Sequence, residues 1–297
     1  MRARAVRVSA VAVAVVLAAA GCGTDEPPSL FAKGEQVLVG AKNDQPGTGF
    51  EVHAGEFAGL DITVAREVLN RVGSEPPDFT GVLSKDRAPK LQKGKLDLVA
   101  ATFSITAQRM KPLSEGGDGL DFVGPYASGQ QGMLIRAADR DRYKRLEDLN
   151  GALVCVWRST TSATELDKPA YQQIRKAEME DAKTCVDALK RGDVDAVSTD
   201  QLILYGFMHA DPSLLVPVGI GFGALNDYGI AFAKGHRKDC ELAKAALKAY
   251  IEGNDWDRDF QLNLPDVPTD KRNEAHPTSD EIDALSCRDS PQGAPAK

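Results

Sequence analysis

The feature that most constrains the fold is the alternation of short apolar segments with amphipathic helical segments. Such alternation is typical of βαβ units built on a parallel sheet. In the first part of the chain we expect strands at residues 37–41 and 96–102, helices at 59–72 and 88–93, and a loop at 43–49. One face of the longer helix would then carry Leu60, Val64, Val68, Leu69 and Val72.

The pattern starts again after residue 130. We expect strands at 133–136, 152–156, 195–198 and 229–233, and helices at 183–189 and 241–252. In the last helix the expected inward residues are Leu242, Ala245, Ala246, Ala249 and Tyr250. The sequence also changes character near 127–131, where we expect a loop-rich boundary, and again near 219–229.

Two chain crossings, with the last strand and helix returning to the first unit, predict two α/β lobes joined by a two-strand hinge. The first lobe is expected to comprise residues 35–130 and 227–264, and the second residues 131–226. The polar, proline-bearing segment 265–297 is expected to wrap the surface. Ligands of open α/β sheets bind at the carboxyl ends of strands, which here means the cleft between the lobes.

Composition and charge exclude several classes of protein. With 297 residues, 42% hydrophobic and 27% charged, the chain is typical of a globular protein. Its net charge is −7, and the first 21 residues carry three arginines and no acid, so the remainder carries −10. Such an acidic surface argues against nucleic acid as a partner. A site for an anion must therefore be a local cluster of cations.

The N-terminus predicts export. Three arginines precede the apolar run at residues 10–20, which is too short to span a bilayer but is typical of a signal peptide over residues 1–21. Small residues before Cys22 resemble a lipobox, so we expect Cys22 to be lipidated and residues 22–34 to form a tether to the membrane. The alternative is a plain secretory signal followed by an incidental cysteine.

The other four cysteines are Cys155, Cys185, Cys240 and Cys287. An even number in an exported chain predicts two disulfides, with three possible connectivities. A Cys155–Cys185 pair is favoured because both residues fall in one compact segment, which leaves Cys240–Cys287. Zinc is the competing interpretation, but no C-x-x-C occurs and the four histidines are scattered. We expect no metal and no cofactor.

Several ordered motifs resemble those of the family 3 solute-binding proteins, the receptors of polar amino-acid ABC transporters. They are S-I-T-A-Q-R at 104–109, D-F-V-G-P-Y at 121–126, F-A-G-L-D at 57–61 and A-L-K-R-G-D-V-D-A at 188–196. The resemblance covers residues 37–264 and implies the type II periplasmic-binding-protein fold. Within the family, D-Q-P-G at 44–47, the R-x-x-x-L-x-x-G element at 87–94 and the placing of Cys155 and Cys185 are most similar to glutamate-binding lipoproteins of actinobacteria.

A free amino acid presents a carboxylate and an ammonium, so its receptor needs a fork-shaped cation and a carboxylate. The resemblance assigns these roles to Arg109 and Asp200, and assigns additional contacts to Thr102 and Ser104. Thr160 and Thr161 stand at a turn that donates to the ligand carboxylate in the family, although Ser159 replaces the usual glycine. The alternatives are a surface arginine, and helix N-caps for Asp200 and for one of the threonines.

The resemblance also places Lys42, Arg87 and Ser84 around the ligand side chain. Three cations and one anion would suit a dicarboxylate with one ammonium, which favours glutamate or aspartate. Glutamine or asparagine is the fallback, because an amide also accepts hydrogen bonds from these donors. Lys42 and Arg87 could instead be solvated surface charges.

No catalytic signature such as G-x-S-x-G or H-E-x-x-H occurs, so we expect no enzyme activity. The expected partners are a free amino acid, ABC permease subunits and, through the lipid on Cys22, the membrane. Two alternatives remain at this point. One is a subunit that reports a bound amino acid to a membrane sensor, and the other is a dehydratase on the same fold.

Overall fold

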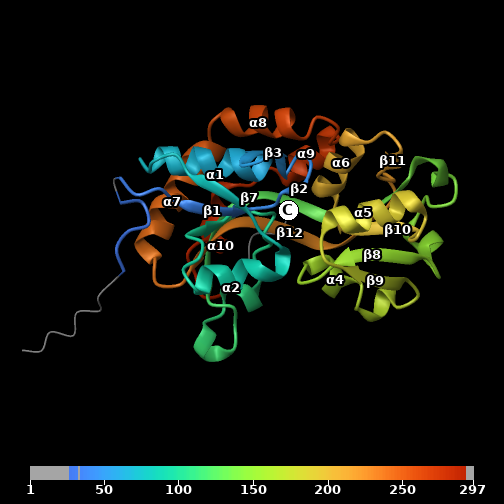
Figure 1. Ribbon diagram of the computed structural model, residues 1–297, viewed down its shortest axis with the longest axis horizontal. Coiled ribbons are helices and arrows are strands. Elements are labelled where there is room, and N and C mark those ends of the chain that lie inside the picture. The colour runs from blue at the N-terminus through green and yellow to red at the C-terminus, as the bar shows by residue number, and fades with distance from the viewer. Residues whose placement is uncertain (1–26, 33, 292–297) are drawn as a thin grey trace, which may run out of the picture.

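Figure 1 shows the computed structural model, which describes residues 27–32 and 34–291. Most of its strands form one continuous mixed sheet that runs through both halves of the elongated molecule. The strands are β1 (Leu38–Ala41), β2 (Asp44–Gln45), β3 (Gly49–His53), β4 (Glu56–Ala58), β5 (Asp78–Gly81), β6 (Leu98–Val99), β7 (Leu120–Arg136), β8 (Leu153–Trp157), β9 (Arg175–Met179), β10 (Ala196–Asp200), β11 (Leu214–Leu215) and β12 (Gly221–Ala233). The α-helices are α1 (Leu60–Arg71), α2 (Arg87–Gln92), α3 (Ala107–Met110), α4 (Thr161–Glu165), α5 (Ala182–Arg191), α6 (Gln201–Ala210), α7 (Arg237–Ile251), α8 (Asp255–Asn263), α9 (Thr269–Ala275) and α10 (Ser279–Leu285).

The strand order of the main sheet is β5-β1-β6-β12-β7-β10-β8-β9. Strands β5, β1 and β6 are parallel, and so are β10, β8 and β9. The long strands β7 and β12 are antiparallel to each other and join the two parallel groups. We call the part built on β5, β1 and β6 the first lobe and the part built on β10, β8 and β9 the second lobe. Two α/β lobes on a shared pair of strands are therefore present, as predicted, while the residue limits of the lobes stay a prediction.

The loop-rich boundary expected near residues 127–131 is wrong. These residues lie inside β7, which runs unbroken for 17 residues. Likewise, most of the change at 219–229 is strand β12. The two strands leave their register twice, between Phe222 and Asn226 and between Tyr228 and Ile230. These irregularities lie where the chain passes from one lobe to the other.

The predicted elements are otherwise found within a few residues of their expected positions, except that the strand expected at 96–102 shortens to two residues. Helix α1 buries Leu60, Val64, Val68 and Leu69, the apolar face predicted for it. It lies with α8 on one side of the first lobe's sheet, and α2 lies on the other side (Figure 1). The loop expected at 43–49 contains β2 and leads into β3, so this segment forms a small three-stranded sheet with β4.

Two expectations about the last third of the chain are wrong. In α7 the buried face is Ala243, Ala246, Leu247, Tyr250 and Ile251, whereas Leu242 is 55% exposed. The segment after residue 265 does not simply wrap the surface. Its helices α9 and α10 bury Ala275, Ile282 and Leu285 in the core.

Both predicted disulfides are present. Cys155 on β8 is bonded to Cys185 on α5, with Cα atoms 5.6 Å apart. Cys240 on α7 is bonded to Cys287, just after α10, with Cα atoms 5.8 Å apart. The second bond joins the C-terminal segment to the first lobe, and the Cys287 amide also donates to the Phe122 carbonyl of β7 at 2.8 Å. With these sulfur atoms bonded to each other, the zinc interpretation falls.

The signal peptide and Cys22 lie outside the described residues. Within the described part of the chain, no helix is both long and apolar enough to cross a membrane.

Candidate ligand site between the lobes

The carboxyl ends of strands from both lobes meet at one small cavity. Strand β6 leads to Thr102 and Ser104, β8 leads to the turn before Thr160, and β10 ends at Asp200. The residues that line the cavity are Gln45, Ser84, Arg87, Thr102, Ser104, Arg109, Trp157, Thr160, Thr161, Ser162, Thr199, Asp200 and Ile203. Eight of the nine ligand-binding residues predicted from the sequence are among them, and Lys42 is the exception.

Arg109 and Arg87 reach the cavity from the first lobe. The Arg109 Nη1 atom donates to the Ser104 carbonyl at 2.6 Å, and Nη2 donates to the Ser159 carbonyl of the second lobe at 3.4 Å. Arg87 is buried, and its guanidinium donates to the carbonyls of Ser84, Ala101 and Ser159. Among the described residues neither arginine forms an ion pair. Two positive charges thus face the cavity with only carbonyl oxygens and aromatic carbon against them.

Phe103 supports both guanidinium groups. The central carbon of Arg87 lies 4.0 Å from the centre of its ring, and that of Arg109 lies 4.6 Å away. A cation held over an aromatic face is stabilised by the ring's quadrupole. Burial lowers the pKa of Arg109 to about 10. It lowers that of Arg87 well below its usual range, and Arg109 adds to this effect by charge repulsion. A bound anion would relieve that repulsion.

Asp200 provides the negative charge on the second lobe. It occupies the N-cap position of α6, but its side chain makes no capping bond. Its carboxylate instead accepts from the side-chain amides of Gln131 on β7 and of Asn226 on β12, the latter at 2.8 Å. Burial raises the pKa of Asp200 to about 7, although the nearby arginines favour the ionised form. The N-cap alternative therefore describes its position and not its interactions.

This pKa predicts a pH-dependent affinity for any ligand with an ammonium group. Only ionised Asp200 can pair with that ammonium, so affinity is full above pH 7 and falls as the pH drops below it. Between pH 8 and pH 6 we expect the dissociation constant to rise about tenfold. Titration calorimetry across this range measures the effect. Asp200→Asn is the control, with weaker binding and a flat profile. A wild-type profile that is flat down to pH 5 would contradict the role of Asp200.

Thr160 and Thr161 present hydroxyl groups from the second lobe. Thr160 is the N-cap of α4, because its hydroxyl accepts from the Ala163 amide at 3.2 Å, which was the alternative considered for it. It also lines the cavity. The Thr161 hydroxyl lies 3.4 Å from that of Ser104, across the gap between the lobes. Ser159 adopts a φ of 61°, so it takes the left-handed conformation despite not being glycine.

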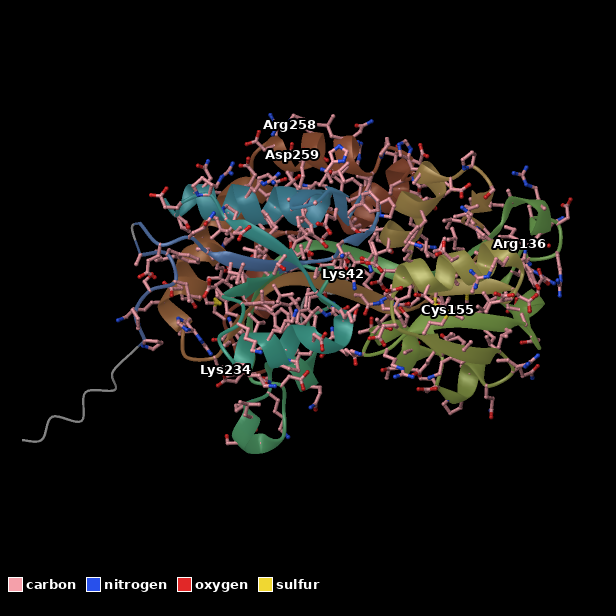
Figure 2. All side chains as sticks on the ribbon, viewed as in Figure 1. Lys42, Arg136, Cys155, Lys234, Arg258 and Asp259 are labelled. Atoms are coloured by element: carbon pink, nitrogen blue, oxygen red, sulfur yellow. A yellow bond between two sulfur atoms is a disulfide. The ribbon has the colours of Figure 1, made fainter. Side chains whose placement is uncertain are left out.

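Lys42 does not line the cavity. It is buried near the middle of the molecule (Figure 2), where its Nζ atom lies 3.4 Å from both the Ser84 hydroxyl and the Val82 carbonyl. It also pairs with Asp44 at 3.8 Å. Burial lowers the pKa of Lys42, and Asp44 opposes that shift. Lys42 therefore stands behind Ser84, one residue away from the cavity.

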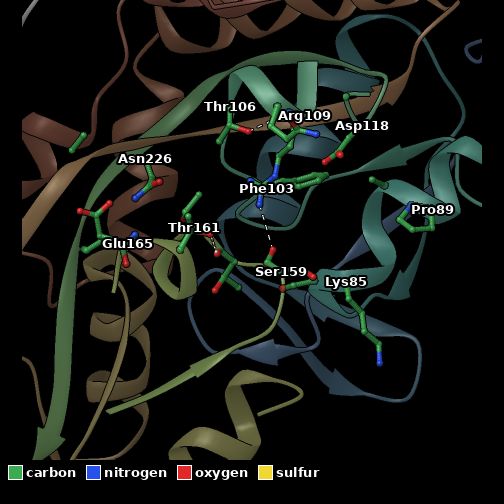
Figure 3. Close-up of a pocket in the computed structure, with 18 of the residues that line it drawn as sticks. Lys85, Pro89, Phe103, Thr106, Arg109, Asp118, Ser159, Thr161, Glu165 and Asn226 are labelled. Atoms are coloured by element: carbon green, nitrogen blue, oxygen red, sulfur yellow. Dashed lines mark hydrogen bonds between the residues drawn. The ribbon is translucent and has the colours of Figure 1, made fainter. Parts of the chain in front are cut away.

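The cavity is closed in this structure. It measures about 20 Å³, which is room for a single water molecule and not for an amino acid. It opens into an outer chamber of about 850 Å³, which is lined by both lobes (Figure 3). Arg109, Thr160 and Thr161 line both spaces. Entry of an amino acid requires the lobes to separate and both arginines to leave the Ser159 carbonyl.

The sequence reasoning missed four contributors to this site: Gln45, Phe103, Gln131 and Asn226. Gln45 follows Asp44 in a motif that was noted, and Phe103 lies between the predicted residues Thr102 and Ser104, so both were within reach of a local argument. Gln131 and Asn226 come from the two joining strands and have no local signal. Within residues 27–32 and 34–291, no group of three or more His, Cys, Asp or Glu side chains could hold a metal ion.

Two α/β lobes closing over a small charged cavity define a binding protein of the two-lobed type. The match to a family model covers residues 37–258, and the chain belongs to the bacterial extracellular solute-binding proteins, family 3. The predicted family and type II fold are thereby confirmed. Because the members of this family are binding components of transporters, the prediction that the chain is not an enzyme is also confirmed.

Similar proteins bind several amino acids. Glutamate-binding protein GluB of Corynebacterium glutamicum is 32% identical over 239 residues, which are 77% of this chain and 78% of that protein. The ABC transporter glutamine-binding protein GlnH of Bacillus subtilis is 28% identical over 240 residues, covering 80% and 84%. Among solved structures, an ancestral arginine-binding protein bound to arginine superposes with a TM-score of 0.66 at 28% identity, covering 76% of this chain and 97% of that one.

Proposed function

We propose that this protein captures an acidic amino acid, glutamate or aspartate, by closure of its lobes and delivers it to the permease of an ABC transporter. The observation that carries the proposal is the charge of the cavity. Two guanidinium groups without ion pairs face one carboxylate, on opposite lobes. A dicarboxylic amino acid, with two negative charges and one positive charge, neutralises this set.

The main-chain groups of the ligand have natural partners. The α-carboxylate would replace the Ser159 carbonyl as acceptor for Arg109 and take further hydrogen bonds from Ser104 and Thr161. The α-ammonium would donate to Asp200. Because these groups belong to different lobes, the ligand stabilises the closed state by contacts that the open state lacks. Hinge closure on β7 and β12 follows from this arrangement.

The side-chain carboxylate would be held by Arg87 and the Ser84 hydroxyl, with Lys42 behind Ser84 adding a positive field. A basic amino acid would bring a cation against Arg87, and like charges in a buried site are costly. An amide would accept the same hydrogen bonds but leave one guanidinium unneutralised. Glutamine is the second candidate, because the Bacillus subtilis relative binds it and shares 28% identity.

Calorimetric titration tests the proposal. Residues 23–297, stripped of ligand by unfolding and refolding with the disulfides intact, would be titrated with glutamate, aspartate, glutamine, asparagine and arginine. We expect micromolar or tighter binding of an acidic amino acid and none of arginine. Tighter binding of glutamine or arginine would contradict the acidic specificity. Silence with all five would contradict an amino-acid ligand.

We also propose that the protein is exported and anchored through lipid on Cys22. At the start of the described residues, the Ser29 hydroxyl and the Leu30 amide both bind the Asp239 carboxylate, at 2.6 and 2.9 Å. These bonds support a tether that meets the first lobe near α7. Mass spectrometry of the membrane-extracted protein should detect acyl chains on Cys22, and Cys22→Ser should be released from the membrane. A variant that stays bound would contradict the anchor.

A further inference from the structure

Asp61, near the start of α1, is a fully buried carboxylate that does not line the cavity. Its Oδ2 atom accepts from the Thr102 amide at 2.8 Å, and its Oδ1 atom accepts from the Tyr126 hydroxyl at 2.6 Å. Its own amide donates to the Thr48 carbonyl at 2.9 Å. The carboxylate is thus held from three sides, and one of its partners is a residue of the ligand site.

Thr102 has an unusual backbone. Its φ is 43°, in the left-handed region that β-branched residues rarely adopt. The peptide between Ala101 and Thr102 donates its N–H to Asp61 and accepts from Arg87 Nη1 at its carbonyl, 3.0 Å away. In a trans peptide these two groups point in opposite directions. A single peptide therefore connects the Asp61 carboxylate to the Arg87 guanidinium.

The residues after this kink carry the rest of the arginine support. The Phe103 ring lies beside both guanidinium groups, and the Ser104 carbonyl accepts from Arg109 Nη1. If residue 102 left the left-handed region, the Ala101 carbonyl, the Phe103 ring and the Ser104 carbonyl would all change direction. The orientation of both arginines thus depends on the conformation that Asp61 stabilises.

We propose that Asp61 is a positioning residue of the ligand site, which acts through the Ala101–Thr102 peptide to orient Arg87 and Arg109. This rests on the proposed function only for the identity of the ligand. Asp61 itself touches no ligand. Its effect is to hold the segment 101–104 in the one shape that presents both guanidinium groups to the cavity.

Three variants test the mechanism in titrations with the tightest-binding amino acid of the wild-type protein. Asp61→Ala removes the acceptor, and we expect the dissociation constant to rise about tenfold. Asp61→Asn keeps an oxygen that can accept from the Thr102 amide, so its affinity should stay within about threefold of wild type. Adding Thr102→Gly to Asp61→Ala should restore part of the affinity, because glycine adopts a positive φ without help.

That rescue separates positioning from a general loss of packing, since a glycine at 102 would not repair a void at 61. Wild-type affinity in Asp61→Ala, or no recovery in the double variant, would overturn the inference. A measurement that needs no ligand guards against poor folding of the alanine variant. In NMR spectra the Thr102 amide proton should move upfield in Asp61→Asn, because a neutral acceptor replaces a charged one. An unmoved signal would also overturn it.

These outcomes are distinct from failure of the proposed function. If the wild-type protein prefers glutamine or arginine to glutamate, the acidic specificity fails, but the variants can still be compared with that ligand. If no amino acid binds, the Thr102 amide signal still tests whether Asp61 holds the peptide.

Discussion

Replacement of Arg109 by alanine is expected to weaken amino-acid binding by at least about 100-fold, or roughly 3 kcal/mol. Arg109 faces the cavity, and Figure 3 shows it beside Phe103 and opposite Ser159 of the second lobe. Without it, the α-carboxylate of the ligand would be buried with no opposite charge, which costs more than the contact itself contributes. Titration calorimetry at pH 8 measures the loss while Asp200 is ionised.

Two further variants serve as controls for Arg109→Ala. Arg109→Lys keeps the charge but loses the two-pronged donor, so its affinity should fall between those of the wild type and the alanine variant. Arg140→Ala removes an exposed arginine of the second lobe and should bind as the wild type does. Near-wild-type affinity of Arg109→Ala would exclude Arg109 as the carboxylate partner.

Removal of the Cys240–Cys287 disulfide is expected to lower the free energy of unfolding by about 4 kcal/mol. The bond closes a loop with a sequence separation of 47 residues, and without it the unfolded chain gains conformational freedom. The C-terminal segment keeps other attachments in the double variant Cys240→Ser/Cys287→Ser. The Ser286 hydroxyl donates to the Gly124 carbonyl, and Arg237 pairs with Asp121.

Urea unfolding of the double variant, monitored by circular dichroism, measures this change. Ligand affinity should stay close to that of the wild type, because neither cysteine lines the cavity. The matched variant Cys155→Ser/Cys185→Ser opens a shorter loop of 30 residues and should lose slightly less stability. A loss below about 1 kcal/mol for Cys240→Ser/Cys287→Ser would contradict the stabilising role of the bond.

The regular elements could be predicted because their signals are local. The apolar face of α1 repeats at helical spacing within one segment, and the motif around Thr102, Ser104 and Arg109 follows the end of one strand. Such patterns indicate which strand end a side chain follows. They do not give its depth, and for this reason Lys42 was expected at the cavity although it lies behind Ser84.

The joining strands could not be predicted because their reasons are long-range. Gly124, Pro125 and Gly129 look like breakers, yet they lie inside β7, which is paired with β12. A side chain on Gly124 would come within 2.8 Å of the Tyr228 carbonyl, so the glycine marks a close approach of two strands. Gln131 and Asn226 reach Asp200 only through this strand pairing.

The buried face of α7 was misplaced for a packing reason. The periodicity was aligned on Leu242, the most apolar residue near the start of that helix. The structure instead buries the small residues Ala243 and Ala246, which allow the helix to lie close to its neighbours, and leaves Leu242 exposed. Hydrophobicity alone does not distinguish a close helix contact from an exposed leucine.

Titration of the wild type and of Arg87→Ala with both glutamate and glutamine is the most direct test of the acidic specificity. The two ligands differ only in the group that Arg87 is proposed to hold, so the ratio of the two losses isolates that contact. We predict that Arg87→Ala weakens glutamate at least about tenfold more than glutamine. Equal losses for the two ligands would contradict the assignment of Arg87 to the side-chain carboxylate, and with it the acidic specificity.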